Sequence, residues 1–425
     1  MRPRYRVLYG IAAYLLVPLL ILSMLARGWR DRGYWQNFSQ RFGFGPALGS
    51  ASIWVHAVSV GEVQAAAALV LDLAARYPQI PLVVTTVTPT GAARARALFG
   101  ERVEIRFMPF DLPGAARRFL VRVQPRLAVI FETELWPNVY HECRVRRVPL
   151  VLASARISAR SVRRYRKVFG LFEETLAEGV IIGAQAPADA ERFRSIGAPA
   201  ATTHVTGNIK FDFTVPDEVV ARGRELRRFH AAHRPVWVAG STHAGEEAIL
   251  LDAQRHLQSV HPDALLILAP RHPPRFAEVA QWLAREHVRF VKISERRACD
   301  ADTSVLLVDS LGELLDCYAA ADAAFVGGSF VPVGGHNLLE PAALGRPVLS
   351  GPYYSNSEDI AKLLIARGVL AVVHDAPQLA ARLGELLSDD AERARIGKVA
   401  RESIADNRGS LAKLLRLIEP LLAGA

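Results

Sequence analysis

The chain has 425 residues, of which 51% are hydrophobic and 22% are charged, and its formal net charge is +10. This composition is that of a folded protein, and the length predicts two domains or more. The positive charge suits an anionic partner such as nucleic acid, a membrane surface or a phosphorylated substrate. No nucleic-acid-binding module is recognisable. The three cysteines lie far apart and predict neither a disulfide framework nor a metal site.

The N-terminal segment 7–26 is almost wholly apolar and has arginines on both sides. At helical rise this length just spans the hydrocarbon core of a bilayer. A cleaved signal peptide is the alternative, but no small-residue cleavage site follows the apolar run. We therefore expect residues 1–30 to form a membrane-anchor helix. The aromatic and basic segment 28–45 suits either a membrane interface or an ordinary amphipathic connector.

From residue 53 onward, short apolar runs alternate with longer helical patterns. Strands are expected at 53–58, 82–86, 127–131, 150–153 and 180–183, and again at 236–240, 265–269, 305–308, 323–326, 348–349 and 370–373. Strands separated by helices of this length predict parallel sheets that are covered on both faces. The pattern weakens into a charged stretch at 211–233, where we place the connection between two such units.

The sequence thus predicts two doubly wound α/β domains that face each other across a cleft. Their expected bounds are 31–215 for the N-terminal domain and 216–409 for the C-terminal domain, with a terminal helix at 410–425. Ligands of such sheets bind at the carboxyl ends of the strands. Polar loops at those ends are therefore the candidate site residues, and the cleft is the expected place for the site.

Three polar positions follow strands of the first domain. Glu62 stands at the start of the helix after the first strand, where an ionised carboxylate can act as a general base or merely complement the helix dipole. Glu132 and Glu134 follow a later strand and suit either substrate binding or a solvated loop end. Lys210 ends this domain, where it can neutralise a carboxylate or phosphate. An ordinary surface lysine is the alternative.

In the second domain, the glycine-rich segment Gly327–Pro341 follows a buried strand and leads into an expected helix near Asn337. Free backbone N–H groups at such a place predict a cradle for an anion, most plausibly a phosphate. Asn337 and Glu340 also have capping-box spacing, so a purely structural role is an equal alternative. Other polar loops after strands lie at 240–247, 269–273 and 309–314.

Several catalytic signatures are absent from the sequence. There is no Walker A motif, no nucleophile elbow and no G-x-G-x-x-G fingerprint after the first strand, which argues against an NAD enzyme. His, Asp and Glu residues show no convincing metal spacing, and we expect no bound metal.

Five motifs follow one another along the chain, namely Val55–Glu62, Glu132–Asn138, Gly207–Asp212, Pro270–His272 and Gly334–Pro341. Together they resemble the motifs of the 3-deoxy-D-manno-octulosonic acid (Kdo) transferases of lipid A biosynthesis. The resemblance covers nearly the whole chain. It implies a GT-B fold, with the acceptor bound by the first Rossmann-like domain and CMP-Kdo by the second. The implied acceptor is an acylated, bisphosphorylated glucosamine disaccharide.

The resemblance also implies roles for individual residues. Glu62 corresponds to the proton acceptor, and Glu132 and Lys210 correspond to residues that stabilise the transition state. The CMP-binding segments correspond to Arg271 and His272, to Leu311, Gly312 and Glu313, and to Asn337, Leu338, Leu339 and Glu340. No cofactor is implied, because CMP-Kdo is the donor substrate. Our own candidate for the acceptor phosphates is the Arg-rich run 156–167, with a solvated helix face as the alternative.

We expect a single inverting displacement on the cytoplasmic face of the inner membrane, where a single-pass anchor keeps the enzyme beside its lipid acceptor. Two alternatives share the architecture. One is a GT-B transferase or epimerase acting on another nucleotide sugar. The other is a non-catalytic membrane protein that binds nucleotide sugars.

Overall fold

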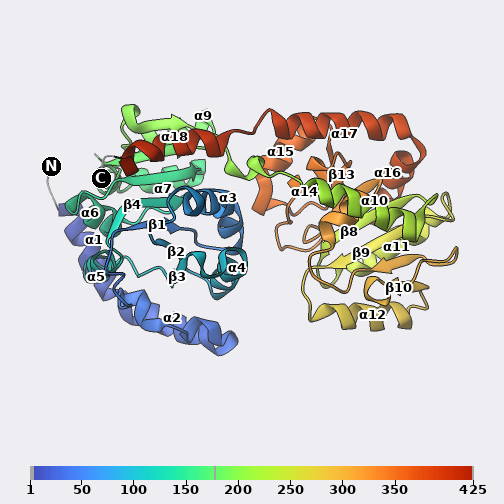
Figure 1. Ribbon diagram of the computed structural model, residues 1–425, viewed down its shortest axis with the longest axis horizontal. Helices are drawn as coiled ribbons and strands as arrows, with labels where there is room; N and C mark the ends of the chain where they lie inside the picture. Colours follow the sequence, from blue (N-terminus) through green and yellow to red (C-terminus); the bar gives the residue numbers. More distant parts are fainter. Residues whose placement is uncertain (1–3, 177–178, 424–425) are drawn as a thin grey trace. The chain divides into compact units, whose positions relative to one another are not determined.

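Strands and helices alternate along the chain and form two α/β units (Figure 1). The computed structural model describes residues 4–176 and 179–423. Unit 1 comprises the chain up to Asp212 together with the segment from Asn407 onward, and unit 2 comprises Phe213–Asp406. The prediction of two doubly wound α/β domains is confirmed by their sheets.

The N-terminal segment forms two helices, α1 (Arg4–Leu15) and α2 (Val17–Arg30). They are bent by 48° at the break between them, and Pro18 in the first turn of α2 accounts for the break because it lacks an N–H and its ring crowds the preceding turn. The prediction of one continuous helix is therefore wrong. Among the described residues no single helix is long and apolar enough to cross a membrane. Within that part of the chain, only the bent pair of α1 and α2 has the length and apolar composition for it when the two helices are taken together.

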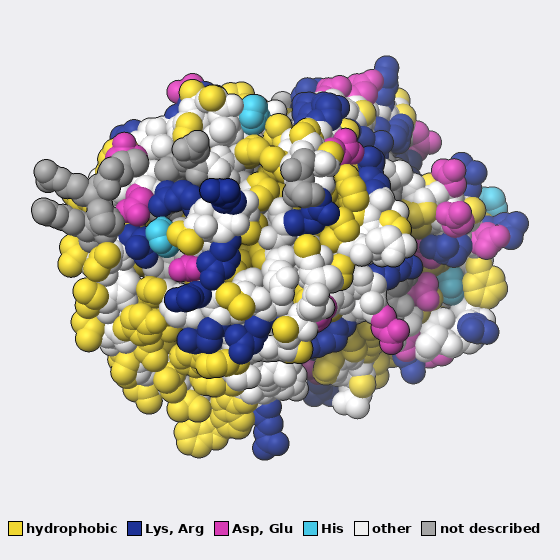
Figure 2. Space-filling model, turned by 60° about the vertical axis from the view of Figure 1, so that its left-hand side comes forward, with side chains coloured by type: hydrophobic (Ala, Val, Ile, Leu, Met, Phe, Trp, Pro, Cys, Tyr) yellow, Lys and Arg dark blue, Asp and Glu magenta, His cyan; other side chains and the backbone are white. Residues whose placement is uncertain are grey.

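Helix α1 lies against unit 1, and much of the apolar surface of both helices stays exposed. The Tyr14 hydroxyl accepts a hydrogen bond from the Gly114 backbone N–H at 3.1 Å, and Arg6 lies 3.7 Å from Glu174. Figure 2 shows hydrophobic side chains gathered at the lower left of this side of the molecule, with Lys and Arg side chains beside them. The exposed large side chains of the two helices and of the break between them include Leu8, Ile11, Leu15, Leu16, Leu19, Leu22, Leu25 and Trp29.

The sheet of unit 1 has seven parallel strands in the order β3-β2-β1-β4-β5-β6-β7. They are β1 (Ser52–His56), β2 (Leu82–Thr86), β3 (Glu104–Phe107), β4 (Pro125–Phe131), β5 (Leu150–Ala155), β6 (Val180–Ala184) and β7 (Thr203–Val205). The order reverses between β1 and β4, so the carboxyl ends of these two strands border the topological switch point where ligands of such sheets bind.

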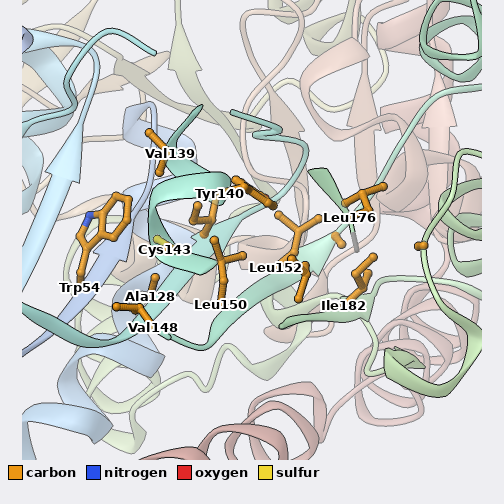
Figure 3. Packing of buried hydrophobic residues seen from close by; sticks show 14 of the residues in the cluster. Trp54, Ala128, Val139, Tyr140, Cys143, Val148, Leu150, Leu152, Leu176 and Ile182 are labelled. Atoms are coloured by element: carbon orange, nitrogen blue, oxygen red, sulfur yellow. The ribbon is translucent and has the colours of Figure 1, made fainter. Parts of the chain in front are cut away.

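Helices cover both faces of this sheet. They are α3 (Val60–Arg76), α4 (Pro89–Phe99), α5 (Pro113–Val123), α6 (Pro137–Val145), α7 (Ala159–Arg166), α8 (Phe169–Thr175), α9 (Pro187–Arg194) and α18 (Ser410–Ala423). On one face, Trp54 of β1 and Leu152 of β5 lie in the same buried cluster as Tyr140 and Cys143 of α6 (Figure 3). Both faces of the central strands are buried against helices, as their continuous apolar sequence predicts.

The C-terminal helix α18 packs on the other face of this sheet, in a buried cluster with α3. The Asp212 carboxylate accepts hydrogen bonds from the backbone N–H groups of Gly409 and Leu411, both at 2.6 Å. These donors lie at the start of α18, where a carboxylate is favoured by the helix dipole. The expected terminal helix is therefore α18 of unit 1, although the chain directly before Asn407, Phe213–Asp406, belongs to unit 2. The last two residues of the predicted range 410–425 lie outside the described residues.

Unit 2 repeats the topology, with the strand order β10-β11-β9-β8-β12-β13-β14. Its strands are β8 (Val236–Thr242), β9 (Leu265–Pro270), β10 (Phe290–Lys292), β11 (Val305–Leu307), β12 (Ala323–Val326), β13 (Val348–Ser350) and β14 (Leu370–Val372). Its helices are α10 (Asp217–Ala231), α11 (Glu246–Gln258), α12 (Arg275–Arg285), α13 (Leu314–Ala320), α14 (Leu339–Ala343), α15 (Glu358–Ala366), α16 (Ala376–Ser388) and α17 (Asp390–Ala405). The switch point of this sheet lies between β8 and β12.

The chain passes between the units at the start of the charged stretch 211–233, within which the sequence places the connection. Helix α10 fills most of the remainder of this stretch. A Cβ on Gly223 would come within 2.4 Å of the Ala319 side chain, so α10 and α13 approach closely because this position is glycine. Strands β3, β7 and β10, which the apolar pattern did not predict, all lie at sheet edges.

Candidate active site

Glu62 lies in the first turn of α3, directly after the carboxyl end of β1. Its carboxylate accepts a hydrogen bond from the Val58 backbone N–H at 2.9 Å and from the Ser59 hydroxyl at 3.3 Å. The pKa of Glu62 is raised to about 7. Burial is the main cause and the charges of Glu132 and Glu134 add to it, while the hydrogen bonds from Val58 and Ser59 oppose it. A carboxyl group with a pKa near neutrality has the proton affinity that a general base needs.

Glu132 lies after the carboxyl end of β4 and is held between two cations. Lys210 Nζ donates to its Oε1 and Arg156 Nε donates to its Oε2, both at 3.0 Å. Burial raises the pKa of Glu132, but the two cations together outweigh it and leave the pKa below its usual range. The structure therefore brings Glu132 and Lys210 together, with Glu132 ionised at neutral pH.

The backbone at Glu132 adopts φ +57°, in the left-handed region. This conformation costs a residue with a side chain about 1–3 kcal/mol and is found where surrounding structure enforces it, often at functional sites. Here the Glu132 N–H donates to the Ala153 carbonyl at 3.0 Å, and the hydroxyl of Thr133 donates to the Arg156 carbonyl. The loops after β4 and β5 are thus tied together, which aims the Glu132 carboxylate at Lys210 and Arg156.

Arg156 and Glu134 are also part of this cluster. Arg156 is the first residue of the basic run 156–167, which we expected to bind the acceptor phosphates, but its guanidinium bonds Glu132. The remaining basic residues of the run are exposed on α7 and just after it. Burial raises the pKa of Glu134. The signal that could have identified Arg156 is its place immediately after a buried strand next to β4.

His56 ends β1 and is completely buried. Its Nδ1 lies 2.8 Å from the Thr85 hydroxyl, and its Nε2 has no hydrogen-bond partner within the described part of the chain. Burial lowers the pKa of His56 to about 4, so the ring is neutral at physiological pH. His56 is therefore an uncharged residue of the buried core at the end of β1.

In unit 2, three histidines gather where the loops after β8, β9 and β12 meet. The rings of His243 and His336 are stacked with centroids 5.0 Å apart, and their Nε2 atoms lie 2.8 Å from each other. The ring of His272 packs edge-on against His243 at 5.2 Å. Burial lowers the pKa of His336 to about 3 and also lowers that of His243. Both rings are therefore neutral near pH 7, and one Nε2–H donates to the other.

The other donor-site candidates also line the carboxyl edge of this sheet. Arg271 and His272 are exposed directly after β9, and Leu311, Gly312 and Glu313 follow β11. Leu338 and Leu339 have buried side chains, so only their backbone can face a ligand. Asn337 accepts from the Leu339 N–H and donates to Glu340 Oε1, both at 3.1 Å. The predicted pairing of Asn337 with Glu340 is present, but α14 begins at Leu339 and has only five residues.

The glycine-rich segment differs from its prediction. The backbone N–H groups of Gly328, Ser329 and Phe330 all donate to the carboxylate of Glu246. The expected anion cradle is therefore filled by the chain's own carboxylate. Phosphate binding by these three N–H groups is not possible while Glu246 holds them.

Within the described residues, no group of three or more His, Cys, Asp or Glu side chains is arranged to hold a metal ion. The rings of His243, His272 and His336 contact one another through ring nitrogens and ring faces and are not arranged around a common point. The prediction that no metal takes part stays a prediction.

Replacement of Lys210 by Met is expected to lower the free energy of unfolding by about 1–3 kcal/mol at pH 7, toward the lower figure because Lys210 is 25% exposed. The pKa of Glu132 is depressed in the folded state, so its stabilisation is present above the unfolded pKa and is lost as pH falls through the folded value. Urea unfolding of the variant and wild type should therefore converge only when pH falls below the depressed folded pKa of Glu132, which lies under the usual glutamate value of about 4.3.

Lys413→Met is the matched control, because Lys413 is exposed on α18 of the same unit. It should unfold like the wild type at both pH values. Equal stability of Lys210→Met and wild type at pH 7 would show that the Glu132–Lys210 pair contributes nothing.

Known proteins resemble this chain in sequence and in fold. A family model described as 3-deoxy-D-manno-octulosonic-acid transferase (kdotransferase) matches residues 36–213, and a model described as glycosyl transferases group 1 matches residues 249–403. The chain is 39% identical to the 3-deoxy-D-manno-octulosonic acid transferase of Haemophilus influenzae, over 98% of this chain and 99% of that protein. It is 38% identical to the enzyme of the same name from Bordetella pertussis, with the same coverage.

Among solved structures, a putative UDP-N-acetylglucosamine 2-epimerase from Listeria monocytogenes matches with a TM-score of 0.54 and 16% identity, over 87% of this chain and 95% of that one. HepE from Anabaena, in complex with UDP, matches with a TM-score of 0.53 and 16% identity, over 88% of this chain and all of that one. At this identity the likeness concerns the fold alone, and it supports two Rossmann-like domains of GT-B type. The sequence relationships go further: the chain belongs to the family of 3-deoxy-D-manno-octulosonic acid transferases, which are glycosyltransferases.

Proposed function

We propose that the chain transfers Kdo from CMP-Kdo to a hydroxyl of an acylated, bisphosphorylated glucosamine disaccharide, with inversion and with Glu62 as the general base. The observation that carries this proposal is the Glu62 carboxyl group, which lies at the switch point of unit 1 with a pKa of about 7. The relatives of the chain from Haemophilus influenzae and Bordetella pertussis are named 3-deoxy-D-manno-octulosonic acid transferases.

In the proposed reaction, Glu62 takes the proton of the acceptor hydroxyl. At the same time, the oxygen of that hydroxyl forms a bond to the anomeric carbon of Kdo. The bond from that carbon to the CMP phosphate oxygen breaks, and CMP leaves with the electron pair. One base and no covalent nucleophile suffice for this single displacement. CMP is a good leaving group, so the step needs no additional acid.

The neighbouring charges have separate tasks in this scheme. The ionised Glu132 carboxylate raises the proton affinity of Glu62 and places negative charge where positive charge develops on the sugar as the bond to CMP breaks. Lys210 and Arg156 keep Glu132 ionised and fixed. In unit 2, the exposed Arg271 and His272 are placed to bind the CMP phosphate, since a guanidinium forms paired hydrogen bonds with phosphate oxygens.

The surface of unit 1 supports a lipid acceptor. Helix α7 begins three residues after Arg156, and Arg160, Arg163, Arg164, Arg166 and Lys167 are exposed on it or next to it. We propose that these cations bind the acceptor phosphates. The exposed apolar side chains of α1 and α2 would hold the enzyme on the inner membrane, at the cytoplasmic face where a nucleotide sugar is available.

Replacement of Glu62 by Gln keeps the size of the side chain and removes the base. We expect kcat to fall by about 10²–10⁴-fold, while the KM for CMP-Kdo changes little. The assay follows the product by mass spectrometry after incubation with CMP-Kdo and the tetra-acylated precursor. Asp72→Asn, on the same helix at a distance from the site, is the control and should retain activity.

Near-normal turnover of Glu62→Gln would exclude Glu62 as the base. Transfer from a UDP-sugar in place of CMP-Kdo by the wild type would favour the alternative GT-B activity. Binding of CMP-Kdo without any transfer would favour a non-catalytic protein.

Replacement of both Leu19 and Leu22 by Glu on α2 is expected to release the protein from vesicles, because these side chains are 61% and 60% exposed and would have to carry charge into the lipid. Flotation with vesicles that contain anionic lipid measures the bound fraction. Leu71→Glu, at an exposed position of α3, is the control. Equal flotation of the double variant and wild type would contradict attachment through α2.

A further inference from the structure

We infer that Glu246 is a positioning residue for donor binding, which holds the loops after β8 and β12 in the arrangement that CMP-Kdo requires. This inference rests on the proposed function of unit 2 as the donor-binding unit. Glu246 is the first residue of α11, and it is completely buried. It is absent from the residues that the family resemblance marks for catalysis or CMP binding.

The Glu246 carboxylate accepts four hydrogen bonds from backbone N–H groups. Oε1 accepts from Ser329 and Phe330, both at 2.9 Å, and Oε2 accepts from Gly328 at 2.7 Å and from His243 at 2.9 Å. Successive N–H groups that point to one spot form an anion-binding nest. Glu246 supplies the anion from within the chain, and the nest in turn satisfies a carboxylate that would be costly to bury alone.

These bonds connect two loops that also contact each other through their histidines. Glu246 fixes the backbone of His243, whose ring lies against His336 with the two Nε2 atoms 2.8 Å apart. The Gly335 N–H donates to the Gly328 carbonyl at 2.7 Å, so the segment that carries His336 folds back on the nest. His336 directly precedes Asn337, the first residue of a proposed CMP-binding segment.

The same anchor reaches the third donor loop. The Arg271 N–H donates to the Thr242 carbonyl at 2.9 Å. Thr242 is the residue before His243, and its hydroxyl donates to Glu247 at 2.8 Å. The position of Arg271, the proposed phosphate ligand, thus depends on the loop that Glu246 holds. Glu246 touches none of the proposed reacting atoms and acts through these loops.

Replacement of Glu246 by Gln tests the inference. A glutamine side chain has one acceptor oxygen and presents an N–H₂ group to N–H donors, so at least one pair of the four bonds is lost. We expect the Kd of CMP, measured by calorimetry, and the KM of CMP-Kdo to rise about tenfold or more. The KM of the acceptor should stay within about twofold, since unit 1 has its own core.

Asp322→Asn separates positioning from general instability. Asp322 is another carboxylate of unit 2, partly buried, and it bonds Arg227 and the Val236 N–H at the amino end of the sheet. This variant should lower the melting temperature and leave the Kd of CMP unchanged. Wild-type affinity for CMP in Glu246→Gln, or an equal loss of affinity in both variants, would overturn the inference. A wild-type protein that does not bind CMP would instead overturn the proposed function.

Hydrogen exchange of the wild-type protein gives a second test that needs no variant. The amides of residues 328–330 should be protected before any ligand is added, and CMP should add little to that protection. Rapid exchange of these amides without CMP, with strong protection when CMP binds, would mean that the ligand and not Glu246 occupies the nest.

Discussion

An ionised carboxylate between two cations, Glu132 with Lys210 and Arg156, sets the electrostatics of unit 1. Its three members come from the loops after β4, β5 and β7, so the cluster exists only when the parallel sheet has formed. The pairing keeps a negative charge in a mostly buried place, and this charge helps to hold a proton on the neighbouring Glu62 up to about pH 7. Two carboxylates in one site thus differ in charge because only one has cationic partners.

Unit 2 has the same topology but uses its buried carboxylate differently. At the switch point between β8 and β12, the Glu246 carboxylate accepts four hydrogen bonds from backbone N–H groups. Glu246 stabilises the conformation of the loops after β8 and β12, whereas Glu132 keeps a negative charge between Lys210 and Arg156. Arg271 and His272 are exposed and can bind an anion from solution. The same fold therefore carries a candidate base, Glu62, in unit 1, and exposed Arg271 and His272 beside the loops that Glu246 holds in unit 2.

Much of this arrangement could be predicted from the sequence. Central strands such as β1, β4 and β8 are buried on both faces and so are continuous apolar runs. Edge strands β3, β7 and β10 are partly solvated and lack such runs, and the apolar pattern of α10 is weak because this helix is rich in charged residues. Position after a strand pointed to Glu62, Glu132 and Lys210. The same rule included Glu246 in the polar loop 240–247, but it could not reveal the role of this residue, because its partners Gly328–Phe330 lie more than 80 residues away in the sequence.

The proposed mechanism depends on Glu62 having a pKa near neutrality, and titration of the Glu62 carboxyl group tests this most directly. Carbon-13 NMR of protein labelled at the glutamate carboxyl carbons, compared with the Glu62→Gln variant, identifies the signal of Glu62. We predict a titration midpoint at about pH 7. A midpoint near the usual glutamate value of about 4.3 would contradict the account, since burial and the neighbouring carboxylates would then leave Glu62 no stronger a base than a glutamate in water.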